Sequence, residues 1–267
     1  MTRHTWVLTE PKSGMVNQAL GLAEAIGYPC ALKTLRPTAP WRWLPPGLWR
    51  AGVFGVAPGE DGAPPLAPPW PDLTISCGRR SVGPALAVKR ASGGRTFAIH
   101  IQYPRTRIDR FDAIIAPEHD GLVGPNVLTT RGSVSHVTTA KLADGAARFG
   151  AGLAHMPRPL VGVLVGGPNN VFAFDAPDAA LLARDLATLA RASGAGLAVT
   201  VSRRTGPAAV EALRRGLEGL PVAYWDGRGD NPYFGYLALA DAFVVTGDSV
   251  NMVTEACATG KPVHVVA

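Results

Sequence analysis

The residues best suited to chemistry lie near the end of the sequence, in a run that reads Thr-Gly-Asp-Ser-Val-Asn-Met-Val-Thr-Glu from Thr246. A short apolar stretch ends at Thr246, and an amphipathic stretch follows it. The hydroxyl of Ser249 is placed to cap the resulting helix or, with the free amides of the first turn, to bind a diphosphate. Glu255 comes roughly two helical turns later, where it could accept hydrogen bonds from a ribose diol. A capped helix with an unrelated glutamate is the alternative, and the length and order of the run favour a nucleotide site.

Two other loops of the second half also follow apolar stretches, and both offer small or hydrogen-bonding groups that suit phosphate oxygens. One loop contains Gly166 and Gly167, followed by Pro-Asn; the other contains Ser202, Arg203, Arg204 and Thr205. Neither loop has the Gly-Lys-Ser/Thr of a Walker A motif. Neither has the Gly-x-Gly-x-x-Gly of a dinucleotide site, which disfavours a nicotinamide cofactor.

The first half has two loops of the same kind. In one, Lys12 offers a cation and Gly14 allows close approach of the backbone to a ligand. In the other, Arg79 and Arg80 stand at the expected start of a helix, where they can clamp a phosphate or a carboxylate. An ordinary glycine turn and a solvated surface pair remain the alternatives. Cys77 has no histidine or aspartate beside it in the sequence, so we interpret it as a small buried residue.

Three further features carry weaker signals. His119 lies between Glu118 and Asp120 and is our candidate general base, although a solvated turn explains these residues equally well. No pair of histidines has helical spacing with an acid, so no metal site is expected. The stretch from Trp41 to Trp70 is rich in proline and tryptophan. It is either a surface for a partner or a membrane, or a packed irregular insertion.

Composition restricts the class of protein. With 47% apolar and 17% charged residues in 267, the chain can build large cores. Its net charge of +6 comes from 26 basic and 20 acidic residues that are scattered along the sequence, which favours a small anionic ligand over a nucleic acid. The three cysteines form no Cys-x-x-Cys pair, which indicates reduced thiols. No signal peptide and no apolar run of ~18 residues is found, so we expect a cytoplasmic protein, with peripheral membrane contact left open.

The candidate loops described above would each connect a strand to a helix. The sequence shows the corresponding alternation of strands and helices twice. Short apolar runs alternate with longer amphipathic runs, which predicts an α/β fold with parallel sheets. Because Pro157-Arg-Pro159 interrupts the pattern, we predict an N-terminal Rossmann-like domain over 1–156 and a C-terminal one over 157–267. Strands are expected at the ranges 5–9, 31–35, 73–77, 97–102, 111–116, 127–130, 160–165, 197–202, 222–225, 242–246 and 263–266. Helices are expected at 17–26, 81–91, 141–153, 177–192, 207–217, 233–240 and 250–258. The second domain is expected to lack a closing helix.

The whole chain resembles the ELM1 family, which is named for a plant mitochondrial fission factor and is widespread in bacteria. The matching segments begin with Lys12-Ser-Gly, Asn17-Gln and Ile75-Ser-Cys-Gly-Arg-Arg. They continue through Phe111 to Asp120, Gly166-Gly-Pro-Asn, Ser202-Arg-Arg-Thr, and Asp248-Ser-Val-Asn-Met-Val-Thr-Glu. The last motif also resembles the donor half of GT-B glycosyltransferases. The chain differs from the family pattern in its first loop, where Met15 occupies the position of a histidine.

The resemblance implies a GT-B-like arrangement and a metal-independent glycosyltransferase, since helix amides and basic side chains can stabilise a leaving diphosphate. The implied donor residues are Gly166, Gly167, Ser202, Arg203, Arg204, Thr205, Ser249, Asn251, Met252 and Glu255. The implied acceptor or phosphate side comprises Lys12, Gly14, Asn17, Arg79 and Arg80. No cofactor is expected beyond a nucleotide-diphosphate sugar as substrate.

Two other functions compete with this one. The resemblance equally implies a non-catalytic adaptor that recruits a protein partner, for which the Trp/Pro-rich stretch would serve. A sugar-nucleotide epimerase is disfavoured by the lack of Gly-x-Gly-x-x-Gly and Tyr-x-x-x-Lys. The sequence indicates no particular sugar, acceptor or oligomeric state.

Overall fold

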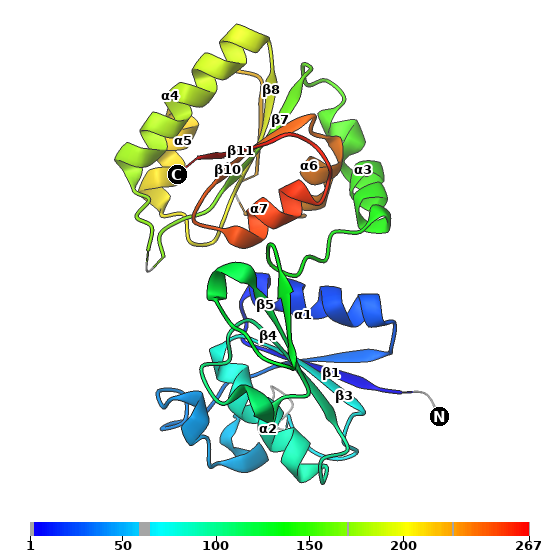
Figure 1. Cartoon of the computed structure of the whole chain (residues 1–267). Helices are drawn as coiled ribbons and strands as arrows, with labels where there is room; N and C mark the ends of the chain where they lie inside the picture. Colours follow the sequence, from blue (N-terminus) through cyan, green and yellow to red (C-terminus); the bar gives the residue numbers. More distant parts are fainter. Residues whose placement is uncertain (1–2, 59–64, 170, 226, 267) are drawn as a thin grey trace. The chain divides into compact units, whose positions relative to one another are not determined.

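The computed structural model describes residues 3–58, 65–169, 171–225 and 227–266 of the chain. The chain forms two compact units, Met1–His136 (unit 1) and Val137–Ala267 (unit 2). Each unit is a parallel β-sheet with helices on both faces (Figure 1). The prediction of two consecutive Rossmann-like α/β domains is confirmed.

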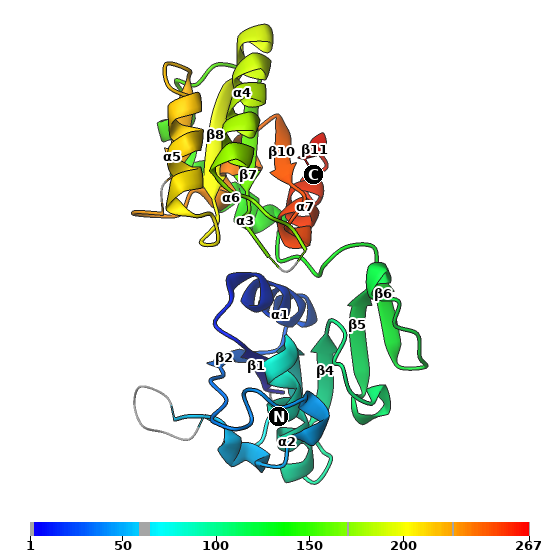
Figure 2. The same ribbon diagram turned by 90° about the vertical axis from the view of Figure 1, so that its left-hand side faces the viewer.

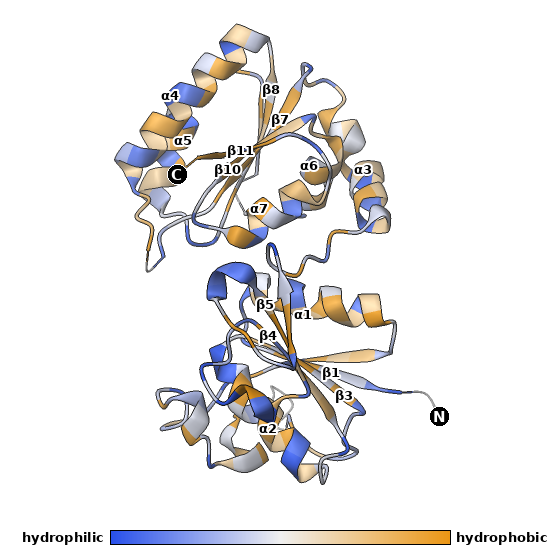
Figure 3. Ribbon diagram, in the orientation of Figure 1, coloured by the Kyte–Doolittle hydropathy of each residue, from blue (hydrophilic) through white to orange (hydrophobic). Residues whose placement is uncertain are grey.

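Unit 1 is built on a six-stranded sheet in which every strand pair is parallel. The strands are β1 (Thr5–Thr9), β2 (Cys30–Thr34), β3 (Leu73–Cys77), β4 (Phe97–Ile101), β5 (Ala113–Pro117) and β6 (Val127–Thr130), in the spatial order β2-β1-β3-β4-β5-β6. The central strands β1 and β3 are buried throughout, as expected for a parallel sheet that is covered on both faces. Figure 3 accordingly shows the sheet strands mostly in hydrophobic colours.

Two helices cover opposite faces of this sheet. α1 (Ser13–Ile26) packs Ala19 and Ala23 with Val7 of β1, whereas Leu8 lies in the core that α2 (Val82–Ala91) closes with Val88. Successive strand residues point to opposite faces, which explains why Val7 and Leu8 enter different cores. Short 3₁₀ helices complete the unit at η1 (Pro46–Leu48), η2 (Gly52–Gly55), η3 (Arg79–Ser81), η4 (Ile108–Arg110) and η5 (Glu118–Asp120).

Unit 2 has a five-stranded parallel sheet in the order β11-β10-β7-β8-β9. Its strands are β7 (Leu160–Val165), β8 (Gly196–Val201), β9 (Val222–Trp225), β10 (Ala242–Thr246) and β11 (Val263–Val266). α4 (Ala176–Ser193) and α5 (Pro207–Gly216) cover one face (Figure 2). α3 (Thr139–Leu153), α6 (Tyr233–Leu239) and α7 (Val250–Cys257) contribute to the cores of the other face.

The structure moves the predicted boundary between the domains from 156/157 to 136/137. The reason is α3, which packs on α6 of unit 2. A Cβ added to Gly145 of α3 would lie 2.6 Å from the carbonyl carbon of Phe234, so this glycine allows the two helices to touch. The break at Pro157 separates a helix from a strand within unit 2. It does not separate two domains.

Most predicted elements are present, with small shifts at their ends. The bounds of β1, β3, β6, β7, β9, β10 and β11 agree with the prediction. The largest error is at α1, which begins at Ser13 instead of Asn17, because the amides of Met15 and Val16 already bond to the carbonyl of Lys12. Gly14, which was predicted to lie in the loop, is therefore part of the helix. Asn17, the predicted first residue of the helix, lies inside it.

No helix of the described residues is both long enough and apolar enough to cross a lipid bilayer.

Candidate functional site

Three loops of unit 2 meet at the carboxyl edge of its sheet. β10, β7 and β8 are neighbours in the sheet, so the loops that follow these strands lie side by side. This edge of an open parallel sheet is where ligands bind in doubly wound folds. Direct hydrogen bonds connect the loops: the amide of Gly166 donates to Thr246 Oγ1 over 2.7 Å, and Arg204 Nη1 donates to the carbonyl of Gly167 over 2.6 Å. The structure thus brings together the two glycines, the Ser-Arg-Arg-Thr run and the start of α7, which the resemblance assigned to the donor side.

Asp248 connects all three loops. Its carboxylate accepts hydrogen bonds from the Gly167 amide (3.0 Å), the Thr246 hydroxyl (2.6 Å) and Arg204 Nη2 (2.6 Å). Its backbone carbonyl accepts a further bond from Asn169 Nδ2. The Asp248 side chain is only 4% exposed, so its charge is stabilised by these donors and not by water. Asp248 was not among the predicted site residues, although an acid directly after an apolar strand was a visible signal.

The two glycines are required by contacts within the protein. A Cβ on Gly166 would lie 2.1 Å from a carboxylate oxygen of Asp248, and a Cβ on Gly167 would lie 2.5 Å from the carbonyl carbon of Arg204. Any side chain here would force the loops apart. Glycine at both positions therefore fixes the distance between the β7, β8 and β10 loops, whatever ligand they hold.

The two arginines of the second loop have different environments. The guanidinium of Arg204 donates hydrogen bonds to the Asp248 carboxylate and to the carbonyls of Gly167 and Pro168. Arg203 is exposed, and it makes no hydrogen bond or ion pair with any residue that the structure describes. Of the two, Arg203 is the cation available to an anionic ligand, while Arg204 holds the loops together.

Ser202 and Thr205 serve the loop itself. Ser202 Oγ accepts a bond from the amide of Arg204 and lies 3.3 Å from Thr205 Oγ1. Thr205 is buried and donates to the carbonyl of Gly166. The predicted contact of these hydroxyls with phosphate stays a prediction, and both already have partners in the protein.

α7 begins as the sequence predicted. Ser249 is the N-cap, and its hydroxyl accepts a bond from the amide of Met252 over 3.4 Å. Asn251 and Met252 lie half-buried in the first turn, where backbone amides have no partner further up the helix. The Met252 amide is already bonded to Ser249, and the positive end of the helix dipole at this turn favours an anion.

Glu255 is more enclosed than the sequence suggested. It is 6% exposed, and Tyr233 of α6 donates its hydroxyl proton to Glu255 Oε2 over 2.5 Å. Burial, together with the negative charge of Glu255, raises the pKa of Tyr233 well above its ordinary value, so Tyr233 remains a donor. Sequence reasoning missed Tyr233, because nothing in its local pattern indicates a partner 22 residues away.

At the carboxyl edge of the unit 1 sheet, basic residues surround a buried acid. Glu10, directly after β1, is 4% exposed. Its carboxylate lies 3.3 Å from Lys12 Nζ and 3.8 Å from Arg80 Nη1, and it accepts a bond from the Arg80 amide. Arg79 instead donates to the carbonyls of Trp43 and Leu44. The predicted cations are therefore close to one another, but each already has a partner in the protein.

Two single-residue interpretations have different outcomes. Cys77 is fully buried, and burial raises the pKa of its thiol to about 12, so it is a protonated core residue, as predicted. The His119 side chain is 55% exposed in a 3₁₀ turn, and its Nε2 lies 3.8 Å from Asp120. Nothing encloses this imidazole within unit 1, and its role as a base stays a prediction.

Among the described residues, no cluster of three or more His, Cys, Asp or Glu could hold a metal ion.

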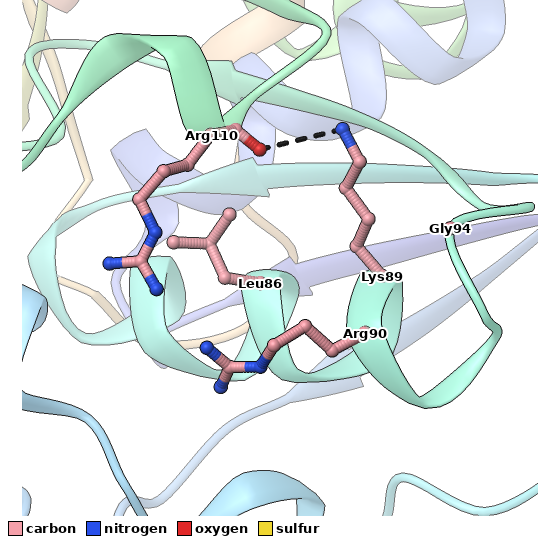
Figure 4. A pocket seen from close by; sticks show the side chains of 5 residues that line it. All are labelled: Leu86, Lys89, Arg90, Gly94 and Arg110. Atoms are coloured by element: carbon pink, nitrogen blue, oxygen red, sulfur yellow. Dashed lines mark hydrogen bonds between the residues drawn. The ribbon is translucent and has the colours of Figure 1, made fainter.

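Unit 1 also has a basic hollow of about 310 Å³, lined by Leu86, Lys89, Arg90, Gly94 and Arg110 (Figure 4). Arg90 and Arg110 extend past Leu86, and Lys89 Nζ donates to the carbonyl of Arg110 and pairs with Asp112 at 2.8 Å. This hollow lies at the C-terminal end of α2. The predicted site residues Arg79 and Arg80 precede the other end of that helix, so the hollow is separate from the candidate site.

Comparison with known structures supports the fold. A UDP-GlcNAc 2-epimerase from Neisseria meningitidis, solved with UDP-GlcNAc bound, aligns with a TM-score of 0.56 at 11% identity over 98% of this chain and 82% of that one. A putative UDP-N-acetylglucosamine 2-epimerase from Listeria monocytogenes aligns with the same score at 10% identity, over 99% and 79% of the two chains. At this identity the similarity shows the GT-B fold and nothing about activity.

Sequence comparison shows the family. The family model described as mitochondrial fission ELM1 matches residues 13–267. The mitochondrial fission protein ELM1 of Arabidopsis thaliana is 33% identical over 220 residues, which cover 73% of this chain and 51% of the plant protein. An uncharacterized protein of Rickettsia prowazekii is 25% identical over 301 residues, covering 97% of this chain and 82% of its own length. The chain thus spans about half of the plant relative, and it belongs to the mitochondrial fission ELM1 family.

Proposed function

We propose that this protein binds a nucleoside-diphosphate sugar on unit 2 and transfers the sugar to an acceptor. The observation that carries the proposal is the convergence of three loops at the carboxyl edge of the unit 2 sheet. Asp248 holds these loops together, and exposed Arg203 and the N-terminal end of α7 belong to them. Such an edge combines a free cation, backbone amides and a helix N-terminus, which are the groups that bind a diphosphate.

Each part of the ligand has a proposed partner in unit 2. The guanidinium of Arg203 and the positive end of the α7 dipole bind the diphosphate. Glu255 accepts bonds from the ribose, and Tyr233 keeps its carboxylate oriented. When an acceptor oxygen attacks the anomeric carbon, the bond from that carbon to the diphosphate breaks, and the leaving group takes the bonding electrons. The helix end and Arg203 stabilise that negative charge without a metal ion.

Unit 1 supplies the acceptor side in this proposal. Lys12, Arg79 and Arg80, together with Gly14 and Asn17 of α1, are the residues assigned to acceptor or phosphate contacts, and His119 is the proposed base for the acceptor hydroxyl. Support comes from the position of these residues after or near the ends of β1, β3 and β5, on the edge that binds ligands in such sheets.

The fold is compatible with one alternative chemistry. A UDP-GlcNAc 2-epimerase from Methanocaldococcus jannaschii, solved with UDP-GlcNAc and UDP, aligns with a TM-score of 0.52 at 11% identity. The sequence argument against an epimerase tested only for a dinucleotide-binding motif and a Tyr-x-x-x-Lys motif. Since epimerases share this fold, that argument does not separate the two reactions, and a sugar-nucleotide epimerase is the second candidate.

The adaptor function is supported by a different observation. The plant relative is a mitochondrial fission protein, and the Trp/Pro-rich stretch of this chain displays exposed apolar side chains. A non-catalytic member that recruits a partner would need no nucleotide, so nucleotide binding distinguishes this alternative from the other two.

Calorimetric titration with UDP, GDP, UDP-GlcNAc and GDP-mannose tests the proposal. We expect one nucleotide to bind, and we expect Arg203→Ala to weaken its binding about tenfold, the value of one charge-assisted hydrogen bond. Arg191→Ala is the matched control, since Arg191 is also exposed but lies in the last turn of α4. Binding that Arg203→Ala leaves unchanged would refute the assigned site, and a folded protein that binds none of these ligands would favour the adaptor.

Product analysis by NMR separates the two enzymatic candidates. Inversion at C2 of the bound sugar without release of the nucleotide would show an epimerase. Release of the nucleoside diphosphate with the sugar on water or on an added acceptor would show a transferase.

A further inference from the structure

The Trp/Pro-rich segment of unit 1 displays large apolar side chains to solvent. Phe54 is 87% exposed, Trp43 is 62% exposed and Leu48 is 52% exposed. The three lie within twelve consecutive residues, from Trp43 to Phe54. Scattered apolar residues on a surface need no explanation, but three in one short segment do.

The segment is ordered around one buried tryptophan. Trp49 donates its indole proton to the carbonyl of Gly52 over 2.8 Å and packs against the Trp41 ring at 5.9 Å between centroids. It also fills the space beside Gly55 and Gly83, where an added Cβ would lie 2.7 and 2.4 Å from its ring. The exposed side chains are neighbours of this anchor: Leu48 precedes Trp49, Phe54 precedes Gly55, and Trp43 is two residues from Trp41.

Hydrogen bonds hold both ends of the segment, so its apolar side chains are exposed within an ordered backbone. The Thr38 amide and hydroxyl both donate to the carbonyl of Gly55, which closes the segment at its far end. Arg79 donates to the carbonyls of Trp43 and Leu44, which ties the near end to the start of α2. The apolar groups are thus held outward by a fixed scaffold.

The part of this segment from Trp41 to Pro58 carries only positive charges, and Glu60 and Asp61 follow it in the sequence. No aspartate or glutamate occurs between Glu24 and Glu60, whereas Lys33, Arg36, Arg42 and Arg50 lie in that interval. The Arg42 guanidinium stands 4.2 Å from the centre of the Trp43 ring. A small hollow lined by Arg42, Leu44, Trp49, Arg79 and Arg80, among others, shows that two further arginines join this surface.

Aromatic and aliphatic groups interleaved with arginine match the interface of an anionic lipid bilayer. Tryptophan and phenylalanine favour the boundary between headgroups and acyl chains. Arginines next to them are attracted by acidic headgroups, and an acidic residue in the segment would oppose that attraction. A protein partner would not by itself require that residues 41–58 carry only positive charge.

We infer that Trp43, Leu48 and Phe54, with Arg42 and Arg50, form a surface by which unit 1 docks peripherally on an anionic lipid bilayer. The side chains of Trp43 and Phe54 enter the headgroup region, and the arginines pair with acidic headgroups. The inference does not depend on the proposed nucleotide-sugar function, since Trp43, Leu48, Phe54, Arg42 and Arg50 have no role in that function.

Vesicle sedimentation tests the inference on the full chain. We expect binding to vesicles of phosphatidylcholine mixed with phosphatidylglycerol, weaker binding to phosphatidylcholine alone, and release by salt. Phe54→Ser and Trp43→Ser should each weaken the partitioning of the protein onto vesicles about tenfold, because each removes a large apolar side chain that the bilayer would bury. Arg42→Gln and Arg50→Gln should each weaken it about fivefold on acidic vesicles only.

Matched controls lie in unit 2. Leu181→Ser removes an exposed leucine, 52% exposed on α4, and Arg191→Gln removes an exposed arginine of the same helix. Both should bind vesicles like the parent chain. Absence of binding by the parent chain overturns the inference irrespective of any variant. Equal loss in the control variants, or binding that the Trp43 and Phe54 variants retain, overturns it as well.

Discussion

The pairing of Asp248 with Arg204 allows the most direct test of how the unit 2 site is held together. Arg204 Nη2 lies 2.6 Å from Asp248 Oδ2, and the same carboxylate binds Thr246 and the amide of Gly167. Asp248→Asn keeps the shape of the side chain but removes its charge. It leaves one oxygen to accept from three donors, and Arg204 loses its ionic partner.

The expected cost follows from burial. Breaking a buried ion pair by removing one member costs about 3–5 kcal/mol, because the remaining charge is uncompensated. The Arg204 side chain is 41% exposed, so water solvates part of its charge. We therefore expect Asp248→Asn to lower the free energy of unfolding of unit 2 by about 2–3 kcal/mol. Arg204→Gln should cost at least as much, about 2–4 kcal/mol, because the charge that it leaves behind, on Asp248, is only 4% exposed and keeps two neutral donors.

A double-mutant cycle measures the pairwise term. With Asp248→Asn, Arg204→Gln and the double variant, we expect a coupling energy of about 1–2 kcal/mol. Hydrogen exchange of the slowest amides of β7 and β8, followed by mass spectrometry, reports the stability of unit 2 separately. Tryptophan fluorescence would not, since five of the six tryptophans belong to unit 1.

The control cycle uses an exposed pair of the same unit. Arg215 and Glu211 lie 3.5 Å apart on α5, with side chains 75% and 63% exposed. Their coupling should stay below about 0.5 kcal/mol. If the Asp248–Arg204 coupling were no larger than that of this pair, Asp248 would not organise the loops, and the account of the site would be wrong.

Three further predictions concern single residues. Gly167→Ala should destabilise unit 2 by about 1–3 kcal/mol in the same exchange experiment, because its Cβ meets the Arg204 backbone. Gly206→Ala has open space around its Cβ and should cost less, about 0.5–1 kcal/mol, which reflects only the preference of a helix N-cap for glycine over alanine. Burial lowers the pKa of His100 to about 3, so between pH 6.5 and 3 the unfolded chain binds more protons than the folded one. Unit 1 should therefore lose stability as the pH falls through that window. In urea titrations, the free energy of unfolding of His100→Leu should depend less on pH than that of the parent chain. Tyr233→Phe should lower the free energy of unfolding of unit 2 by about 1–2 kcal/mol, because it removes a donor from buried Glu255. Much of that loss should vanish when Glu255→Gln is already present. Simple additivity of the two changes would contradict the pairing.

Much of the fold could be predicted from the sequence, because it depends on local periodicity. Buried parallel strands are short apolar runs, and the helices that cover them repeat apolar residues at helical spacing, so even the bounds of β9, β10 and β11 were predictable. The positions of the candidate loops followed directly, since ligand-binding loops come after strands. The N-cap role of Ser249 was also a local property, decided within the four residues from Ser249 to Met252.

The tertiary structure decided what each polar group does. Arg203 and Arg204 are identical in type and adjacent in sequence, yet only Arg204 reaches Asp248, which is 44 residues away, because the sheet places the ends of β8 and β10 on either side of β7. In the same way, β3 brings Arg80 to buried Glu10, and α6 brings Tyr233 to Glu255. The domain boundary was decided by α3, whose contact with α6 outweighs the proline break that follows it. Periodicity fixes strands and helices because they depend on neighbours in the chain, whereas ion pairs, buried acids and domain boundaries depend on which strand ends the sheet brings together.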